Sequence, residues 1–467
     1  MKARLGFALV VVLAGATAFV GSAPATTTSR ASSTSSGASF SATPVLAWSN
    51  EARRAIVPPS AGPENFGNKF PGEAAVYMGI VHAAIYDAAV AIEGGYRPYA
   101  IALTASADTS AAAAVATAAY DTLIGLQPAL GLNPSQQAIL DGDYAAYLAA
   151  IPDGAAKTNG IAIGEQVAAA VVALRANDGR EKNPTVADLG PPSPGPGVWQ
   201  PDLSRPVLGL RLPGIRPLAL VSASEFRPDG ANPLTSDEYA EDFEQVEQLG
   251  RFDSATRTDE QTTEALFWTD HDIRQWNDGM LRLAAVRGLD LVQTARMLAM
   301  THVAGGDAMI AGFDAKYHYW FWRPYQAIPQ ADTDGNPATV ADPTWRPLRA
   351  TPNFPEYPSA HACHSSGVVE ALDAFFRQRQ GLVLARQPGH RHDARVRPPS
   401  GRGQGRRLGA CPGRLPLPQL RRARLEPRAQ GRPVRRRPLL PATRLREDRC
   451  GTGGGSASSR LPPYWRC

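Results

Sequence analysis

The feature that most constrains the fold is a series of long segments whose apolar residues recur at helical spacing. Residues 72–92 read GEAAVYMGIVHAAIYDAAVAI, with apolar side chains at positions i, i+3, i+4 and i+7, as on the buried face of an α-helix. Similar segments are residues 133–151, 160–177, 234–249 and 289–322. Strand-like alternation between turn residues is scarce. The sequence therefore predicts an all-α protein built as a helical bundle.

Local signals within these segments predict where helices begin and where one is interrupted. Asn133, followed by Pro134, has the side chain of an N-cap, and Thr235 or Ser236 could cap the helix after it. Gly305 and Gly306 lie inside the longest segment. Because glycine weakens a helix interior, we expect that helix to be interrupted there.

The N-terminus has the pattern of an export signal. Lys2 and Arg4 precede the apolar run GFALVVVLAGATAFVG, and Ala23 to Ala25 offer a small-residue cleavage site. We therefore predict a signal peptide over residues 1–25 and a Ser/Thr-rich linker over 26–43, with a retained membrane anchor as the alternative. No later segment is expected to reach the ~18 apolar residues that span a bilayer. The mature chain is expected to be secreted or otherwise extracytoplasmic.

The last part of the chain differs sharply from the rest. Of 48 Lys and Arg and 43 Asp and Glu, residues 377–467 hold 23 Arg, no Lys and four acidic residues, so the remainder is acidic. This tail is dominated by Arg, Pro and Gly, which predicts disorder. It also holds three of the four cysteines, Cys411, Cys450 and Cys467, so we predict no disulfide pairing. We expect a helical domain over residues 44–376 and a tail after it.

Residues 316–324 read KYHYWFWRP and place two cations within a run of aromatic side chains. Burying an unpaired charge is costly. On a helix, Lys316 and Arg323 would be two turns apart on one face, with Pro324 marking the helix exit. A Lys and an Arg together suit a tetrahedral oxyanion. The alternative is an aromatic core face whose cations extend to water.

A second stretch, YPSAHACHSSGVVEAL from Tyr357, has the features of an anion-binding helix start. Ser359 would cap the helix, and the amides of Ala360 and His361 would point at whatever precedes it. His361 adds a group that can exchange a proton near neutral pH, although a structural role is the alternative. His364, one turn later on the same side, is expected at the surface or behind the site, with a role as a ligand as the alternative.

The spacing K-x6-R-P followed by P-S-x-H resembles the first two of three motifs shared by vanadium-dependent haloperoxidases and type-2 phosphatidic acid phosphatases. The resemblance extends over roughly residues 44–376. It implies a helical bundle that cradles vanadate or phosphate. By matching position, Lys316, Arg323, Ser359 and the Ala360 amide would bind the oxygens of the anion, and His361 would be the acid–base catalyst. The family usually has Gly where this chain has Ala360.

The third motif of that family is an Arg followed by two glycines and a His. No match to it follows Phe376. Read one base out of frame, the codons of residues 407–425 can encode such an arrangement, so we predict a frameshift near Phe376. The alternative is a genuine basic arm for nucleic acid or acidic surfaces. Within this frame no metal-ligating residue is identifiable, since the axial His of the third motif is absent.

The resemblance implies an exported enzyme that uses vanadate to oxidise halide with hydrogen peroxide, with His361 handling the proton. The partners would be small molecules, with no specific nucleic acid. Two alternatives remain: an acid phosphatase that uses the same pocket without a cofactor, and an inactive anion-binding protein. A third possibility, a calcium loop at Asp332 to Asn336, lacks the later Glu of such loops, so we interpret it as a turn.

Overall fold

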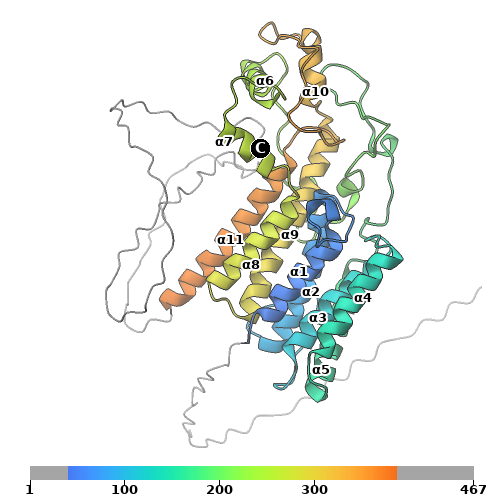
Figure 1. Ribbon diagram of the computed structural model, residues 1–467, viewed down its shortest axis with the longest axis vertical. Coiled ribbons are helices and arrows are strands. Elements are labelled where there is room, and N and C mark those ends of the chain that lie inside the picture. The colour runs from blue at the N-terminus through green and yellow to red at the C-terminus, as the bar shows by residue number, and fades with distance from the viewer. Residues whose placement is uncertain (1–39, 386–467) are drawn as a thin grey trace, which may run out of the picture. The chain divides into compact units, whose positions relative to one another are not determined.

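The computed structural model describes residues 40–385, and every regular element in this range is helical (Figure 1). Two isolated β-bridges are the only strand-like pairings within these residues. The α-helices are α1 Thr43–Ile56, α2 Pro71–Glu93, α3 Ala111–Gly125, α4 Pro134–Ala149, α5 Ala155–Leu174, α6 Asp237–Gly250, α7 Asp259–Phe267, α8 Asp272–Val286, α9 Leu291–Tyr319, α10 Pro324–Ala327 and α11 Ala360–Ala385. The all-α prediction is confirmed. The predicted signal peptide, most of the linker and residues 386–467 of the tail lie outside the described residues.

Helix starts follow the predicted capping chemistry. The Asn133 side chain accepts the Gln136 backbone N–H at 2.9 Å, and the Gln136 side chain in turn accepts the Asn133 N–H at 2.9 Å. This reciprocal pair satisfies two N–H groups that the first turn of α4 would otherwise leave unpaired. Of the two candidates for α6, Ser236 is the cap and accepts the Tyr239 N–H at 3.2 Å.

The centre of the fold is α9, which packs between α2 and α11 (Figure 1). Gly79 of α2 lies against the backbone of His302, and Gly306 of α9 lies against that of Ala75, so α2 and α9 run antiparallel. In α11, His364 contacts Gly305 and Cys363 contacts Gly312, so α11 is antiparallel to α9 as well. The C-terminal end of α9 and the N-terminal end of α11 therefore meet at one end of the bundle.

The predicted interruption of α9 at its two glycines is wrong, because the helix is continuous from Leu291 to Tyr319. These glycines allow close packing instead. A Cβ on Gly305 would lie 2.7 Å from the His364 ring, and one on Gly306 would lie 2.8 Å from a methyl group of Leu218. The tertiary contacts thus account for two residues that the local pattern interprets as a break.

A second group of helices, α3, α4 and α5, flanks this centre. Gly160 and Gly164 of α5 lie directly against α3, while the rings of Tyr120 and Tyr144 stack at 3.9 Å between α3 and α4. The small side chains let the helix backbones approach closely, and the stacked rings fix α4 against them.

Two buried carboxylates fix connecting loops to the bundle. Asp87 on α2 accepts the backbone N–H groups of residues 99–101 at 2.5–3.1 Å. Asp307 on α9 accepts those of residues 218–220 at 2.6–2.8 Å. Each carboxylate satisfies three N–H groups of a segment without regular structure, so these loops have one defined course over the helices.

One described helix, α2, is long and apolar enough to span a membrane by length and composition, with a mean hydropathy of 1.6. The expectation that no later segment reaches this length is therefore wrong. Some 89% of the apolar window is buried within the protein, as expected for the core helix of a bundle.

The last described helix also extends further than predicted. The apolar periodicity suggests an end at Phe376, but α11 continues to Ala385. The added residues are mostly Arg, Gln, Leu and Ala, which are good helix formers even without an apolar face.

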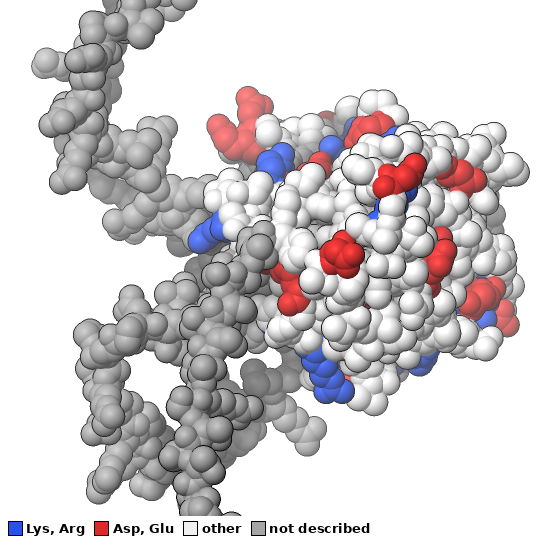
Figure 2. All heavy atoms as spheres, turned by 90° about the horizontal axis from the view of Figure 1, so that it is seen from below, with Lys and Arg blue, Asp and Glu red and all other residues white. Residues whose placement is uncertain are grey.

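The face of the described residues drawn in Figure 2 carries charged side chains of both signs. In the view of Figure 2, acidic side chains are scattered over the face with a few basic ones between them. This distribution agrees with the acidic balance of the sequence before residue 377.

Candidate active site

The two cations of residues 316–324 do not share a helix. Lys316 is in the last turn of α9, which ends at Tyr319 because Trp320 takes a left-handed backbone conformation, with φ of 51°. Arg323 is the N-cap of α10, and Pro324 is its first residue. The predicted shared helix face is therefore wrong, and Pro324 marks a helix entry where an exit is predicted.

The segment between the two helices is held by backbone pairing with a distant loop. Trp199 donates its N–H to the Trp320 carbonyl at 2.6 Å, and Trp322 donates to the Gly197 carbonyl at 2.9 Å. This pairing supports the left-handed turn and directs Arg323 back toward Lys316. The cations converge through a chain reversal that the sequence spacing alone does not reveal.

Both cations are buried, and both face residues 354–356. Lys316 is 1% exposed, and its Nζ donates to the carbonyls of Pro355 at 2.9 Å and Glu356 at 2.6 Å. Arg323 donates from Nε to the Phe354 carbonyl at 2.7 Å and from Nη1 to the Glu356 carboxylate at 2.5 Å. The guanidinium also lies 4.5 Å from the centre of the Phe354 ring, a favourable cation–π distance.

The predicted anion-binding helix start is the first turn of α11. The Ser359 hydroxyl accepts the Ala362 N–H at 3.3 Å, as the predicted cap would. Ala360 and His361 open the helix, so their N–H groups have no carbonyl partner within it. The Nε2 atom of His361 is buried and has no hydrogen-bond partner among the described residues, and the same is true of Nη2 of Arg323.

These groups line one cavity of about 770 Å³. All five residues that the motifs single out face it: Lys316, Arg323, Ser359, Ala360 and His361. The opposite walls come from the end of α6, from α7 and from residues 345–352. The structure thus brings together, at the end of the bundle, residues separated by up to 45 positions in the sequence.

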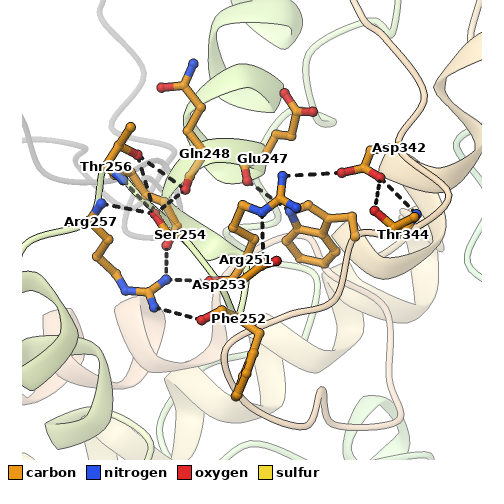
Figure 3. Close-up of polar contacts among 12 residues, drawn as sticks. Glu247, Gln248, Arg251, Phe252, Asp253, Ser254, Thr256, Arg257, Asp342 and Thr344 are labelled. Carbon is orange, nitrogen blue, oxygen red and sulfur yellow. Dashed lines mark hydrogen bonds and ion pairs between the residues drawn. The ribbon is translucent and has the colours of Figure 1, made fainter.

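A polar network around Arg251 and Arg257 connects to the cavity lining at Arg257 (Figure 3). Arg257, which lines the cavity, donates from Nη1 to the carbonyls of Leu249 at 2.6 Å and Arg251 at 2.7 Å. Arg251 pairs with Asp253 at 2.8 Å and Asp342 at 3.3 Å. Since these contacts join residues 249–257 to the 342–345 turn, the rim of the cavity has a fixed shape.

Behind His361 lies a buried cluster that the sequence analysis does not identify. His364, 1% exposed, places Nδ1 2.9 Å from Asp272 Oδ2, which rules out the surface alternative and leaves the position behind the site. Asp272 is fully buried and begins α8, next to His271. The only sequence signal is the DHD triplet before a helix.

The histidines determine the charge of this carboxylate. Burial alone raises the pKa of Asp272, but the neighbouring charges of His364, His361 and His271, with the hydrogen bond to His364, outweigh it, and the pKa is lowered overall. Burial lowers the pKa of His271. Asp272 is thus an anion behind the His361 side of the cavity. Among residues 40–385, no group of three or more His, Cys, Asp or Glu side chains could hold a metal ion.

Residues 332–336, which the sequence analysis weighs as a calcium loop and interprets as a turn, form hydrogen bonds within their own loop. The Asp334 carboxylate accepts the Asn336 N–H at 2.7 Å and the Thr339 hydroxyl at 2.8 Å. These bonds occupy the carboxylate within its own loop.

Comparison with known proteins agrees with the geometry. Residues 296–400 match the family described as the VCPO second helical-bundle domain, a range that includes all five cavity residues and continues past Phe376. The vanadium chloroperoxidase of Curvularia inaequalis is 32% identical over 104 residues, which cover 20% of this chain. That match spans only 16% of the length of the relative.

Solved structures share the fold over a larger part of the chain. The first bacterial vanadium-dependent iodoperoxidase superimposes with a TM-score of 0.54 and 20% identity, covering 73% of this chain and 82% of that one. An apo-type bacterial vanadium-dependent chloroperoxidase gives a TM-score of 0.53 and 15% identity, with 67% and 79% covered. Residues 296–400 thus resemble a domain of the vanadium chloroperoxidases, and the described residues share the fold of bacterial vanadium-dependent haloperoxidases.

Proposed function

We propose that this protein is an exported, vanadate-dependent haloperoxidase, which oxidises halide with hydrogen peroxide. The observation that supports it is the convergence of Lys316, Arg323, Ser359, Ala360 and His361 on one cavity. Export rests on the N-terminal pattern, which lies outside the described residues.

The donor set fits a tetrahedral oxyanion. Arg323 has a buried Nη2, and His361 a buried Nε2, that no described group satisfies. An unsatisfied buried donor is costly, so both atoms favour a bound acceptor. The first turn of α11 adds the Ala360 N–H at the positive end of a helix dipole. Lys316, Arg323, Ser359 and the Ala360 amide would hold vanadate in this cavity.

Vanadate, when bound, supplies the activation of hydrogen peroxide for halide oxidation. The overall reaction converts halide, hydrogen peroxide and one proton into hypohalous acid and water. The role of His361 is to deliver that proton from a ring nitrogen that faces the cavity. The cations and helix amides hold the oxyanion in place, and the buried Asp272 lies 2.9 Å from Nδ1 of His364, behind His361.

A phosphatase is the second candidate, and the cavity volume favours keeping it. At about 770 Å³ the cavity exceeds what peroxide and halide need and could hold the alcohol part of a phosphate ester. The same cations and amides would bind the phosphate group, without a cofactor. An anion-binding protein without activity is the third candidate, since the sequence contains no third motif.

The test compares halide oxidation, with and without added vanadate, with hydrolysis of a chromogenic phosphate ester. In a version whose reading frame is restored after Phe376, we expect vanadate-dependent halide oxidation that falls about 10²–10⁴-fold in His361→Ala, with a smaller change in vanadate affinity. His318→Ala, at an exposed position of α9, is the matched control and should keep full activity. Ester hydrolysis alone would support the phosphatase, and vanadate binding without either activity would support the anion-binding protein.

The cation assignment is tested by calorimetry with vanadate or phosphate. Arg323→Ala should weaken binding by about tenfold or more, because a charged hydrogen bond contributes ~1.5–3 kcal/mol. Arg97→Ala, at an exposed position away from the cavity, should leave binding unchanged. Equal affinities in the two variants would remove Arg323 from the site.

A further inference from the structure

A second cavity, of about 510 Å³, adjoins the first. It lies between α6 and α10, which pack against each other at the same end of the bundle (Figure 1). Pro324, Glu356 and Ser359 line both cavities. A molecule in the second cavity would therefore contact the same Ser359 that opens the proposed anion site.

The two cavities have opposite charge. The first is lined by four cations and two carboxylates: Arg257, Lys316, Arg323, Arg349, Glu264 and Glu356. The second is lined by four carboxylates and no Lys or Arg: Glu238, Glu241, Asp242 and Glu356. Arg323 compensates Glu356. Neither Glu238 nor Glu241 forms an ion pair with any residue in the 40–385 range, so these charges remain available to a ligand.

The remaining walls are aromatic. Tyr239, Phe243, Phe321, Trp322 and Tyr357 line the second cavity, and Tyr239 packs edge-to-face on Phe321 with centroids 6.5 Å apart. The Tyr239 hydroxyl and the Trp322 indole N–H are buried. The Trp322 indole interacts with the Tyr239 hydroxyl, so the aromatic wall also contains two polar groups.

We propose that this second cavity binds a protonated arylalkylamine, which serves as the halogen acceptor of the oxidation proposed above. Hypohalous acid replaces one N–H hydrogen of the amine with halogen, and water and a proton are released. The α6 carboxylates attract an ammonium group, and aromatic faces bind cations and flat rings alike. The volume lies in the range of small-molecule sites. The role as substrate rests on the proposed function, whereas the binding of the amine does not.

The binding test uses 2-phenylethylamine and its neutral counterpart 2-phenylethanol, measured by calorimetry on the full chain without vanadate or peroxide. We expect the amine to bind at least tenfold more tightly than the alcohol, and this preference to shrink as salt is added. Equal affinity for the two compounds would overturn the proposal. A preference for the alcohol would do the same.

The position is tested by substitution. Glu241→Gln together with Asp242→Asn should reduce the preference for the amine about tenfold, whereas Glu165→Gln, at an exposed position on α5, should not. Glu241 is exposed, so Glu241→Gln alone is the second variant if the double variant fails to fold. It should still reduce the preference for the amine about threefold. An unchanged preference in a folded variant would overturn the site.

The outcomes for this site and for the proposed function can be separated. Amine binding that depends on Glu241, without halide oxidation in a version whose reading frame is restored after Phe376, would support the site and refute the haloperoxidase. Halide oxidation with no preference for amine over alcohol, either in binding or as halogen acceptor, would support the haloperoxidase and refute the site.

Discussion

Glu356 is the residue on which the chemistry of the cavity depends most directly. Its carboxylate lies 2.5 Å from Arg323 Nη1, and its own carbonyl accepts a hydrogen bond from Lys316 at 2.6 Å. The side chain therefore occupies part of the cationic surface that an oxyanion would use. Two anions on one guanidinium repel each other, so Glu356 should weaken anion binding while it stabilises the protein without a ligand.

This argument predicts the effect of Glu356→Gln. The variant should bind phosphate or vanadate about tenfold more tightly, since a competing charge is removed. Without an anion it should unfold at a lower temperature than the parent, because Arg323, 8% exposed, loses its countercharge. Thermal unfolding with and without phosphate measures both effects, and the stabilisation by phosphate should be larger in the variant.

The control for that prediction is Glu264→Gln, which removes a carboxylate from the same cavity but not from Arg323. It should leave the stabilisation by phosphate close to that of the parent. An equal gain in both variants would mean that net charge in the cavity, and not the pair with Arg323, governs anion affinity.

At this scale the sequence predicts which residues meet, but not all of their partners. Lys316, Arg323, Ser359 and His361 could be identified because motif spacing survives whatever path the chain takes between them. Glu356 and Asp272 could not be identified in this way. No sequence motif has a fixed spacing that marks Glu356 as the partner of Arg323. Asp272 contacts His364 only because α8 and α11 pack together.

Among the elements, α9 shows where local patterns fail. The same glycines that weaken a helix in isolation allow two neighbours to approach it. Local propensity is a weak prior, and tertiary packing overrides it. The sequence predicts that the helices exist and predicts several of their caps. It does not predict that α9 ends before Trp320, because that end depends on backbone pairing with residues 197–199.

The glycines of α9 give a direct prediction. Gly305→Ala should destabilise the protein by about 1–3 kcal/mol, since its Cβ would lie 2.7 Å from the buried His364 ring. Displacement of His364 should also disturb the Asp272 pair. Gly142→Ala, in α4 with nothing within 4 Å of a new Cβ, should stabilise by up to ~1 kcal/mol. Urea unfolding of both variants would measure this difference, and similar shifts would contradict close packing at Gly305.

The interface of α2 and α9 holds a second buried feature, a pair of stacked histidines. The rings of His82 and His302 lie 4.1 Å apart. Ser49 Oγ lies 2.9 Å from His82 Nε2, and His302 Nε2 lies 3.1 Å from Asn277 Oδ1. Burial lowers the pKa of His82 from 6.5 to about 4. Burial, together with the charges of His82 and His364, lowers the pKa of His302 well below 6.5.

These depressed pKa values predict acid sensitivity. In the unfolded chain both histidines take up protons below pH 6.5, but in the folded protein His82 stays neutral down to about pH 4. Stability is therefore fully present above pH 6.5 and falls as the pH drops toward 4. Each histidine contributes a slope of roughly 1.4 kcal/mol per pH unit. Urea unfolding at pH 7.5 and 5 should show a smaller loss in His82→Gln than in the parent. If His82→Gln loses as much stability between pH 7.5 and 5 as the parent does, His82 is not the source of the acid sensitivity. The control is His318→Gln, at an exposed position.

At the scale of the whole molecule, the chain joins an acidic helical domain to an Arg-rich tail. Among the described residues, all those that line the two cavities come before Phe376. The third motif is a different matter, since the sequence after Phe376 contains no Arg followed by two glycines and a His. In the families that the motifs resemble, that His completes the site. A site with its anion cradle but without this residue should bind oxyanions and turn over poorly.

The frameshift hypothesis predicts that the activity of the chain depends on its reading frame after Phe376. The test expresses two proteins: the chain as given, and a version whose reading frame is restored after Phe376. Both should bind phosphate, because Lys316, Arg323 and Ser359 are present in each. Only the restored version should oxidise halide, by at least the 10²-fold expected from a missing catalytic group. The chain as given should also bind anionic surfaces in a salt-sensitive way, since its tail carries 23 Arg and four acidic residues. Equal halide oxidation in both proteins would contradict the hypothesis and make the Arg-rich tail a genuine part of the enzyme.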